Sequence, residues 1–582
     1  MKHPFFKAGL AIQVILVFAH LFNNRKGLPI PDVDEKSREL IELMHTYEIQ
    51  YSIGAKHTLF QTIWGYDLTW ASFVVFTILI SALALRSSST SLKSGKFIAI
   101  SNVVLWLSCT LAALMFWSIP QQVFFGVLFI TFLISAIFDW RSSAIKSTRI
   151  CVVGAGISGL TAAYELNKKG YRNITVLEKA NYLGGKCSTA VRDDLPFDFG
   201  GHEMLAGYTD VINLAKELNS PSRRSIPPVV YDSTKRAYLN FSESATASGK
   251  YNKLQVMVAA MKYLWLVCVT FRNFAKPATG FKNMPAELNM NLDAWLTHRK
   301  LDAIRDILVF VIKVQGYGQF TNTPACYLVK FMGFRNWISL LLSGMGINET
   351  WPRVFTYGMQ NLCERMAATI MDVRTNITIA RIERNGDSQK GSISVFIERS
   401  KEPLYFDKLI VSTQLDGNAL GFLDLDKSER ELFSHFEAYR FYTTFAKVEG
   451  LDSGVVASNP MNNIEEGEYT GYIKDFTNEP FAIFFSLALN DKVNGEVAKE
   501  KISQVLRRVV PYQGVQPSVL EFLKQNEWHY FPHIPKGDVS GIYNSIEGLQ
   551  GKKNTYFASS ALTFECVGNS VAYSKRLVEE NF

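Results

Sequence analysis

Three glycines and one acidic residue near position 150 have the types and spacing that bind a phosphate-linked nucleotide. Gly154, Gly156 and Gly159 follow the apolar run 150–153, and a second apolar run ends at Glu178. In a strand–turn–helix unit, the first glycine makes the tight turn, the second lets the backbone approach a pyrophosphate, and the third lets the helix pack closely on the strand. The acid accepts hydrogen bonds from a ribose 2′-hydroxyl. These residues predict a dinucleotide-binding loop.

The elements around the glycines must point hydrogen-bond donors at the phosphates. The run 150–153 predicts a buried strand, and the amphipathic stretch 160–166 predicts the helix that follows. The first N–H groups of such a helix have no partner within it, and its dipole favours a negative charge there. We therefore expect Ala155, Ser158 and Lys179 to lie around the nucleotide together with the glycines.

Two glycine-rich segments downstream narrow the kind of nucleotide. Residues 183–189 read Leu-Gly-Gly-Lys-Cys-Ser-Thr, and residues 197–202 read Phe-Asp-Phe-Gly-Gly-His. With the first loop, they resemble the flavin-dependent amine oxidase superfamily, which includes monoamine oxidases, protoporphyrinogen oxidase and phytoene desaturases. The resemblance implies FAD as the cofactor. It assigns support of the phosphates to Gly184, Gly185 and Lys186, and a place under the flavin ring to Gly200 and Gly201.

Later segments extend the resemblance to the end of the chain. Residues 356–362, 377–382 and 408–413 are similar to the family's returning helix and strands, and residues 554–559 and 565–572 to its closing strand and helix. The resemblance places the backbone near Ile379 against the adenine. It also places Val567 and Gly568 at the start of a helix whose dipole is aimed at the flavin N1/O2 edge.

The chain departs from the family in the closing segment. The family usually has Gly-Glu or Gly-Asp after the alanine, whereas this chain has Ser559 and Ser560. This departure leaves the family's ribityl contact in doubt. Cys566 lies in the same segment, so either covalent attachment of the flavin or a small non-bonded side chain is compatible with the sequence, and we favour the second.

The remaining resemblance concerns the size of the substrate. Residues 315–318, 324–327 and 528–533 are similar to the group that contains the fungal cyclopiazonate dehydrogenases. That similarity implies a bulky lipophilic substrate, whereas the amine oxidase label alone would suggest a small amine. Many aromatic side chains lie in the pieces of chain between the parts of the expected flavin domain, including Trp265, Tyr327 and Trp337. We expect them to belong either to an apolar cavity or to the core.

Candidate catalytic residues follow from the chemistry of flavins. A hydride leaves a C–H bond next to nitrogen, oxygen or a conjugated system, so the protein must orient that carbon and can supply a base. His202, Tyr317, His529 and His533 are the candidates for the base, with an ordinary structural role as the alternative for each. The sequence has no pattern typical of a Ser-His-Asp triad, a metal-ligand cluster or a P-loop, so we expect no metal.

Composition excludes several other classes of protein. The net charge is +8 over 582 residues, and no long Lys/Arg run indicates a nucleic-acid surface. The seven cysteines form no C-x-x-C pair and are odd in number. This argues against a disulfide framework or a zinc site and fits a reducing compartment.

The region before the first glycine loop has the composition of a membrane segment. Residues 68–85, 97–117 and 123–138 are nearly uninterrupted apolar runs, and residues 8–22 form a shorter one. A spanning helix needs about 20 apolar residues. The run 8–22 is compatible with a retained span or a signal peptide. We favour the span because no small-x-small cleavage site follows it.

The charges beside these runs predict the orientation of the chain. Lysine and arginine precede the first run, separate the second from the third and follow the fourth, whereas the turn 118–122 has no charge. Four spans with both ends inside satisfy the positive-inside rule. The sequence therefore predicts a multi-pass integral membrane protein with its flavin domain on the cytoplasmic side and the segment 29–51 outside.

A fifth apolar stretch, 254–271, cannot be a single span. A crossing there would put the Gly154 loop and the Gly568 loop on opposite sides of the membrane, although both are expected to contact one flavin. We expect a core or interfacial helix there, with Trp265 and Phe271 either at the entrance to the substrate site or packed in the core.

The expected fold class combines three parts. An all-α transmembrane region covers residues 1–140. A discontinuous, Rossmann-like α/β FAD-binding domain takes residues 148–205, 350–425 and 538–582. An α+β substrate domain, with a mixed sheet and helices, takes residues 206–349 and 426–537.

The expected function is that of a membrane-anchored FAD-dependent oxidoreductase. It would transfer a hydride from a lipophilic substrate to the flavin and pass electrons to oxygen or to membrane quinone, with no nucleic acid as a partner. The alternative is a flavin-binding membrane redox sensor or scaffold without turnover, which the departure at Ser559 and Ser560 allows.

Overall fold

A computed structural model of the chain divides it into two compact units, Met1–Ala144 and Ile145–Phe582. The structure describes residues 4–25, 34–49, 57–86, 92–116, 119–138, 146–226, 228–232, 235–240, 243, 246, 249–318, 323–344, 352–384, 391–459, 467–490 and 492–582. Each unit is described by itself.

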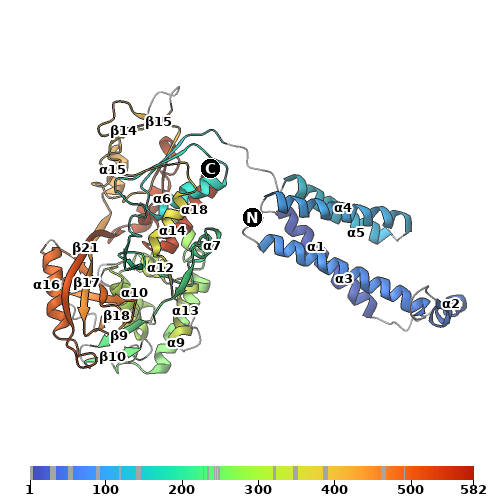
Figure 1. Ribbon diagram of the computed structural model, residues 1–582, viewed down its shortest axis with the longest axis horizontal. Coiled ribbons are helices and arrows are strands. Elements are labelled where there is room, and N and C mark those ends of the chain that lie inside the picture. The colour runs from blue at the N-terminus through green and yellow to red at the C-terminus, as the bar shows by residue number, and fades with distance from the viewer. Residues whose placement is uncertain are drawn as a thin grey trace. The chain divides into compact units, whose positions relative to one another are not determined.

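The first unit consists mainly of helices, and one lies at each of the four apolar runs (Figure 1). α4 packs along α5, and α1 packs against α3 and α5. α5 begins at Ile119, so the predicted turn at 118–122 is largely the first turn of a helix. The elements are α1 (Pro4–Arg25), α2 (Glu35–Thr46), β1 (Glu48–Ile49), β2 (His57–Thr58), α3 (Leu59–Arg86), α4 (Leu92–Phe116) and α5 (Ile119–Phe138).

Some polar side chains of this unit are turned inward, and many apolar ones are turned outward around an apolar core. Gln13 donates to the Asn102 side chain at 3.0 Å, and Asn102 donates to the Ser81 hydroxyl at 3.3 Å, so a buried hydrogen-bond chain links three helices. Apolar side chains on the outer surface are half or more exposed: Ile15, Phe73, Phe76, Leu79, Phe97, Val104, Leu111, Leu114, Val123 and Ile130. Such an arrangement suits an apolar solvent.

By length and apolar composition, one described helical stretch is able to cross a membrane. Among the described residues it is Lys253–Thr270, which belongs to the second unit. The described apolar stretches of the first unit are shorter: Phe5–Val17, Phe73–Ala82, Phe97–Leu111 and Val123–Ile137.

The second unit contains a five-stranded parallel sheet built from three distant parts of the sequence. Its strand order is β12-β4-β3-β16-β22. The strands are β3 (Ile150–Val153), β4 (Ile174–Leu177), β12 (Asp372–Arg374), β16 (Lys408–Val411) and β22 (Thr555–Phe557). β3 and most of its neighbours are buried, as expected of a parallel sheet covered on both faces. The main helices around it are α6 (Ile157–Lys168), α7 (Thr209–Glu217), α14 (Met359–Ala367) and α18 (Val567–Asn581).

A second, seven-stranded sheet is mostly antiparallel, with one parallel pair between β9 and β18. Its order is β10 (Ala237–Asn240), β9 (Pro228–Asp232), β18 (Gly454–Asn459), β19 (Tyr469–Lys474), β20 (Phe481–Ala488), β17 (Glu437–Glu449) and β21 (Ser518–His533). Helices accompany it: α9 (Lys253–Trp265), a π-helical turn (Leu266–Thr270), α10 (Leu292–His298), α11 (Arg305–Val314), α12 (Ala325–Phe331), α13 (Phe334–Gly344) and α16 (Gly495–Leu506).

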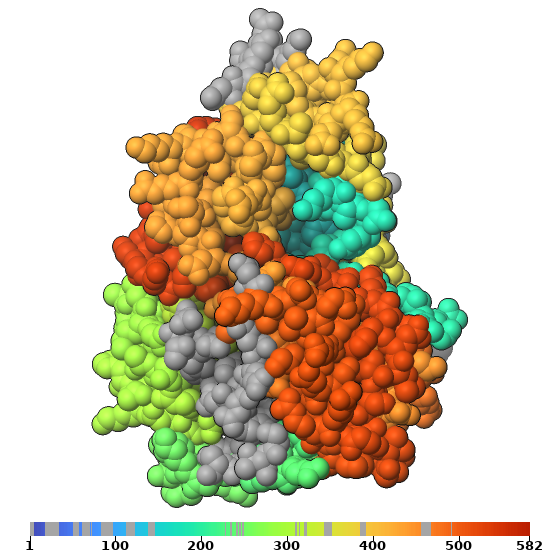
Figure 2. Space-filling view, turned by 90° about the vertical axis from the view of Figure 1, so that its left-hand side faces the viewer, coloured from blue at the N-terminus to red at the C-terminus, as the bar shows by residue number. Residues whose placement is uncertain are grey.

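Shorter elements, most of whose strands form separate two- and three-stranded sheets, complete the unit. They are β5 (Thr189–Arg192), β6 (Leu195–Asp198), β7 (Glu203–Met204), β8 (Ser222–Arg224), β11 (Arg353–Phe355), β13 (Ile379–Glu383), β14 (Ile393–Ile397), β15 (Leu404–Phe406), α15 (Lys427–Phe433) and α17 (Val539–Glu547). Figure 2 shows the teal part of the chain recessed between orange segments above and below it.

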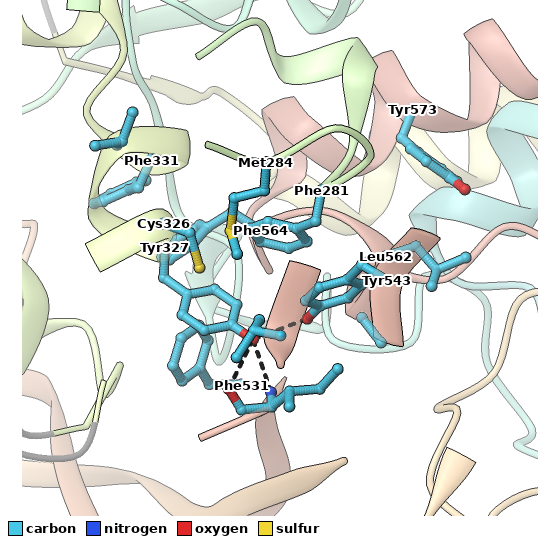
Figure 3. Close-up of a cluster of buried hydrophobic side chains, with 14 of the residues drawn as sticks. Phe281, Met284, Cys326, Tyr327, Phe331, Phe531, Tyr543, Leu562, Phe564 and Tyr573 are labelled. Atoms are coloured by element: carbon cyan, nitrogen blue, oxygen red, sulfur yellow. Dashed lines mark hydrogen bonds between the residues drawn. The ribbon is translucent and has the colours of Figure 1, made fainter. Parts of the chain in front are cut away.

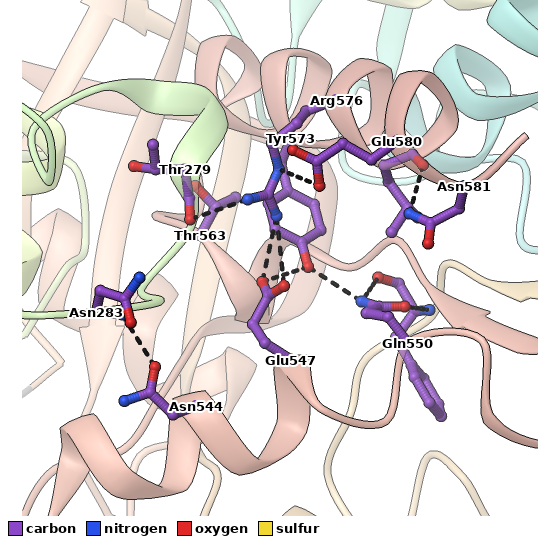
Figure 4. Close-up of polar contacts among 12 residues, drawn as sticks. Thr279, Asn283, Asn544, Glu547, Gln550, Thr563, Tyr573, Arg576, Glu580 and Asn581 are labelled. Carbon is purple, nitrogen blue, oxygen red and sulfur yellow. Dashed lines mark hydrogen bonds and ion pairs between the residues drawn. The ribbon is translucent and has the colours of Figure 1, made fainter.

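A shared core and a polar network join α18 to its surroundings. The core places aromatic side chains of α12, α17 and β21 around Tyr327, whose hydroxyl lies 2.9 Å from that of Tyr543 (Figure 3). In the network, the buried Glu547 accepts from the Tyr573 hydroxyl at 2.7 Å and pairs with Arg576 (Figure 4). These contacts fix the position of α18, so its N-terminus is held rigidly.

Candidate functional site

The Gly154 loop has the geometry that its glycines predict. Gly154 has a φ of +100°, which favours glycine. A Cβ atom on Gly159 would lie 2.1 Å from the carbonyl oxygen of Gly154, so the close approach of α6 to this turn requires a glycine. A Cβ atom on Gly156 would meet nothing within 4 Å. Gly156 thus borders open space at the N-terminus of α6, where no side chain caps the helix.

Glu178 is held at the edge of this loop by two backbone donors. Its carboxylate accepts from the N–H of Ala155 at 2.7 Å and from the N–H of Ala180 at 2.8 Å. The acid is therefore fixed at the end of β4, facing the space beside the loop. This is the position from which an acid can accept hydrogen bonds from a ribose.

A single cavity of about 850 Å³ brings most of the predicted cofactor residues together. Those that line it are Gly154, Gly156, Ser158, Glu178, Lys179, Gly184, Gly185, Lys186, Gly200, Gly201, Ile379 and Val567. Thr378, Ser412 and Thr413 also line it, and the sequence analysis did not single them out. The cavity therefore runs from the carboxyl ends of the parallel strands to the N-terminus of α18.

Three predicted cofactor residues do not line the cavity. Ala155 is fully buried, and its N–H donates a hydrogen bond to the carboxylate of Glu178. Gly159 lies beneath the loop. A Cβ atom on Gly568 would lie 2.2 Å from the Tyr208 ring, so this glycine allows α18 to pack against Tyr208. These residues shape the cavity without facing it, because their backbone is covered by neighbouring chain.

Lys186 makes a contact that the sequence analysis did not predict. Its ammonium group pairs with the carboxylate of Glu565, whose side chain is 8% exposed. Glu565 also accepts from the backbone N–H of Phe531 and, at 3.3 Å, from the Ser560 hydroxyl. The lysine side chain is thus directed to Glu565, and the phosphates are left to the backbone of the Gly184 turn. The signal in the sequence was an acid within the largely apolar segment 561–567.

Phe531 has strained backbone next to this ion pair. Its φ is +53°, in the left-handed region that bulky residues avoid. The hydrogen bond to Glu565 and the aromatic core in which Phe531 is packed hold this conformation (Figure 3). Strain of this kind is retained where the surrounding structure requires it. Here it bends β21 so that the neighbouring Tyr530 lines the cavity.

Among the four candidates for the base, His202 lines the cavity and is largely buried in a group of carboxylates. Its Nδ1 lies 3.4 Å from Asp198 Oδ2, and neither ring nitrogen has a hydrogen-bond partner in the described part of the chain. Burial alone would lower the pKa of His202, but Asp198, Asp475 and Glu203 together outweigh burial, so the pKa is raised. The imidazole therefore retains a proton at pH values where an exposed histidine loses it.

This shift predicts a pH-dependent difference in stability between the wild type and His202→Gln. Because the folded-state pKa lies above the unfolded value of about 6.5, the stabilisation is complete below that value and is lost as the pH rises through the folded-state pKa. Chemical denaturation between about pH 5.5 and 9, which brackets the ordinary value, measures it. His298→Gln, at an exposed position of α10, is the control. An advantage of the wild type that grows with rising pH would contradict the prediction.

Tyr317 lines the cavity but is poorly suited to act as a base. Its hydroxyl donates to the backbone carbonyl of Glu565 at 2.9 Å, and burial raises its pKa well above the ordinary value. Its ring stacks on Tyr530 with centroids 5.6 Å apart, and Tyr530 stacks on Phe441 at 4.8 Å. The three rings form an aromatic wall.

The other two candidates lie in opposite environments. His529 lines the cavity, is 49% exposed and contacts the Gln414 side chain through Nδ1 at 2.8 Å. His533 does not line the cavity. It is buried beside Phe531 and Tyr439, and burial lowers its pKa to about 4. The candidacy of His533 was wrong, because tertiary packing places it in the aromatic core.

For other aromatic and thiol side chains, the structure decides between the alternatives that the sequence left open, and Trp265 alone matches neither. Trp337 and Tyr327 are core residues, Phe271 is buried away from the cavity, and Trp265 is exposed and does not line it. Cys566 does line the cavity at the N-terminus of α18. Burial raises the pKa of its thiol to about 11, so Cys566 is protonated and a weak nucleophile.

The residues present fit a flavin dinucleotide. The open space at Gly156, the uncapped N-terminus of α6 and the fixed carboxylate of Glu178 match a pyrophosphate and a ribose. The same cavity reaches the N-terminus of α18, whose dipole suits the edge of a flavin ring where negative charge collects.

Comparisons with known proteins define the class. Residues 152–218 match the family model of the NAD(P)-binding Rossmann-like domain. The fold, with its Rossmann-like α/β domain, is similar to those of solved structures that include a protoporphyrinogen oxidase-like protein from Exiguobacterium sp. 255-15, with a TM-score of 0.52 and 15% identity, and the cyclohexylamine oxidase from Brevibacterium oxydans IH-35A, with a TM-score of 0.55 and 14% identity.

Particular relatives resemble the chain over most of their own length. The chain is 22% identical to the polyenoic fatty acid isomerase of Ptilota filicina, over 74% of this chain and 95% of that protein. It is 21% identical to the FAD-dependent oxidoreductase oblC of Cochliobolus heterostrophus, over 72% and 88%. The solved structure of the CLA-producing fatty acid isomerase from P. acnes matches with a TM-score of 0.65 and 23% identity, over 75% of this chain and 100% of that one.

Proposed function

We propose that this protein acts on an unsaturated, lipid-like molecule held beside FAD, and that its N-terminal helices anchor it in a membrane. The protein is an FAD-dependent oxidoreductase, and FAD is its cofactor, as its FAD-dependent relatives indicate. The observation that carries the proposal is the cavity, which continues from the Gly154 loop into a chamber with apolar walls. These walls include Val311, Phe331, Met332, Leu340, Phe441, Ile473 and Phe485.

The side chains of the chamber suit an apolar chain. When bound, FAD supplies a hydride acceptor at the ring atom N5. The stacked rings of Tyr317, Tyr530 and Phe441 exclude water and restrict the orientation of a flat, unsaturated group. His202 can hold a proton at Nε2, because that atom is buried and has no partner among the described residues.

A second candidate function is isomerisation of a double bond, in which the hydride returns to another carbon of the same substrate. The similarity to two fatty acid isomerases, which covers 95% of one and 100% of the other, favours this candidate. Net oxidation would instead pass electrons to oxygen or to membrane quinone. A redox sensor or scaffold without turnover would do neither.

Anaerobic mixing of the FAD-loaded protein with polyunsaturated fatty acids tests these alternatives. Bleaching of the flavin that persists until oxygen or quinone is added supports net oxidation. A conjugated product formed without any acceptor supports isomerisation. The proposed substrate class would be overturned if none of the fatty acids tested bleached the flavin and none was converted to a product.

A matched pair of variants links the activity to the chamber. Leu340→Trp fills the apolar wall and should reduce turnover about tenfold or more. Leu520→Trp adds the same ring at a position that is 53% exposed on β21 and should leave turnover unchanged.

The proposed anchoring rests on the outward-facing apolar side chains and the inward-facing polar chain of the first unit. We expect the flavin unit on the cytoplasmic side, because lysine and arginine flank the corresponding ends of the apolar runs. Fusion reporters placed after Trp140 and within residues 118–122 should report opposite sides of the membrane. Both reporters on one side would contradict this topology.

A further inference from the structure

The outer face of α9 and of the π-helical turn after it is an exposed apolar stripe on the second unit. Six side chains spaced at three or four residues are each exposed by 53–63%: Leu254, Met257, Val258, Met261, Trp265 and Val269. They share one side of the helical run Lys253–Thr270. We call this set the α9 face. A contiguous apolar stripe of this size on a folded unit is typical of an interaction surface.

The opposite side of α9 is firmly packed. The exposure of the α9 face is therefore not the result of a loosely held helix. Tyr263 and Leu266 are buried, and the Tyr263 ring lies 4.7 Å from that of Trp337. The Tyr263 hydroxyl donates to the carbonyl of Met332 at 3.2 Å. The Trp337 indole donates to the carbonyl of Ala260 at 3.0 Å. α9 therefore presents the α9 face from a rigid platform.

The charges of the segment that carries the α9 face all have one sign. Residues 244–286 contain no aspartate or glutamate. The basic residues of this segment are Lys250, Lys253, Lys262, Arg272, Lys276 and Lys282. An apolar stripe with a tryptophan and flanking lysines complements the interface of an anionic bilayer, where the apolar side chains enter the acyl boundary and the ammonium groups meet phosphates.

The helix that carries the α9 face packs against the wall at the apolar end of the cavity. α13 packs against α9 through Trp337, and its Asn336, Ser339 and Leu340 line the cavity (Figure 1). Met332, whose backbone carbonyl accepts from the Tyr263 hydroxyl, also lines the cavity. Phe334, at the start of α13, is 49% exposed. A bilayer that covered the α9 face would therefore adjoin the helix that walls the chamber.

We propose that the α9 face is a monotopic membrane contact that docks the second unit on an anionic bilayer and places its chamber against the lipid. The proposal rests on the proposed function, because it gives an apolar substrate a direct route to the cavity. α9 does not span the membrane, since its inner side belongs to the core of the unit. The contact is additional to the helices of the first unit.

Site-specific photocross-linking of the full-length protein tests the contact. p-Benzoylphenylalanine is placed at position 261 or 265, and the protein is reconstituted in phosphatidylglycerol-containing vesicles. Cross-links to lipid are expected from both positions. Position 371, where the methionine is 84% exposed, is the control and should give about tenfold fewer lipid adducts. Adducts to residues 1–144, adducts to a second copy, or lipid adducts no more frequent than at position 371 would each overturn the proposal.

Activity measurements separate this proposal from the proposed function. The double variant Val258→Glu, Trp265→Glu removes two apolar contacts, so kcat/KM on vesicle-dissolved substrate should fall about tenfold or more. kcat/KM on the same substrate in detergent micelles should not change. An equal loss in both would overturn the docking role. If the wild type turns over no lipid, the proposed function fails, and cross-linking still decides whether the α9 face contacts lipid.

Discussion

Gly156→Val should weaken FAD binding about 100-fold while leaving the protein folded. A Cβ atom at this position meets nothing within 4 Å, so we expect the protein to accommodate the valine side chain. It would project into the space beside the N-terminus of α6 that the pyrophosphate needs. A steric cost of about 3 kcal/mol corresponds to an affinity loss of about 100-fold. Flavin absorbance of the purified protein and titration with FAD measure the loss.

Gly159→Val is the matched comparison, because the same substitution meets a different environment three residues later. Its Cβ would lie 2.1 Å from the Gly154 carbonyl oxygen and 2.3 Å from the Ser412 hydroxyl. We expect this variant to lose more than about 3 kcal/mol of folding free energy and to be poorly soluble. The melting temperature of FAD-free Gly156→Val should remain within about 2 °C of that of the FAD-free wild type. A folded Gly156→Val protein that retains stoichiometric FAD would refute the assignment of the loop.

Glu565→Leu should be the most destabilising single change at the far end of the cavity. It leaves the Lys186 ammonium without its partner and the N–H of Phe531 without an acceptor. Removing one member of a buried ion pair costs about 3–5 kcal/mol. Because the Lys186 side chain is 26% exposed and reaches water, we expect the lower end, about 3 kcal/mol. Denaturant unfolding of the FAD-loaded protein measures the change.

Two further variants test the cause of that loss. Adding Lys186→Met removes the unpaired charge, so the double variant should recover part of the stability but not all of it. The N–H of Phe531 still lacks an acceptor, which costs about 1–3 kcal/mol. Glu521→Leu, at an exposed position of β21, which also contains Phe531, should change the free energy of unfolding by less than about 0.5 kcal/mol. A Glu565→Leu protein as stable as Glu521→Leu would show that the ion pair does not hold β21.

Local patterns predicted the dinucleotide loop well. Gly154, Gly156 and Gly159 act within one strand–turn–helix unit, so the steric demands on each are set by residues a few positions away. The apolar runs predicted helices in the first unit for the same reason, because a helix is satisfied by its own backbone. The buried strand 150–153 was recognisable because parallel strands covered on both faces are apolar throughout, whereas the strand 408–411 was expected from the family resemblance.

The candidate base could not be chosen from the sequence. His202, His529 and His533 are alike as residue types, and only the folded chain gives them different surroundings. His202 lies among carboxylates beside the cavity, His529 is half exposed, and His533 is enclosed in an aromatic core. The contact between Lys186 and Glu565 also joins residues that are distant in the sequence. No local pattern relates them, because their proximity depends on how the sheets pack.

The sequence by itself determined that residues 254–271 form an apolar helical stretch outside the parallel sheet. It did not determine which side of that helix is buried, because apolar residues occur all around it. The tertiary structure decided this by packing Trp337 and Met332 against Tyr263 and leaving Met261 and Trp265 exposed. The physical reason is that burial is a property of a surface against its neighbours, whereas the helix itself requires only its own backbone hydrogen bonds.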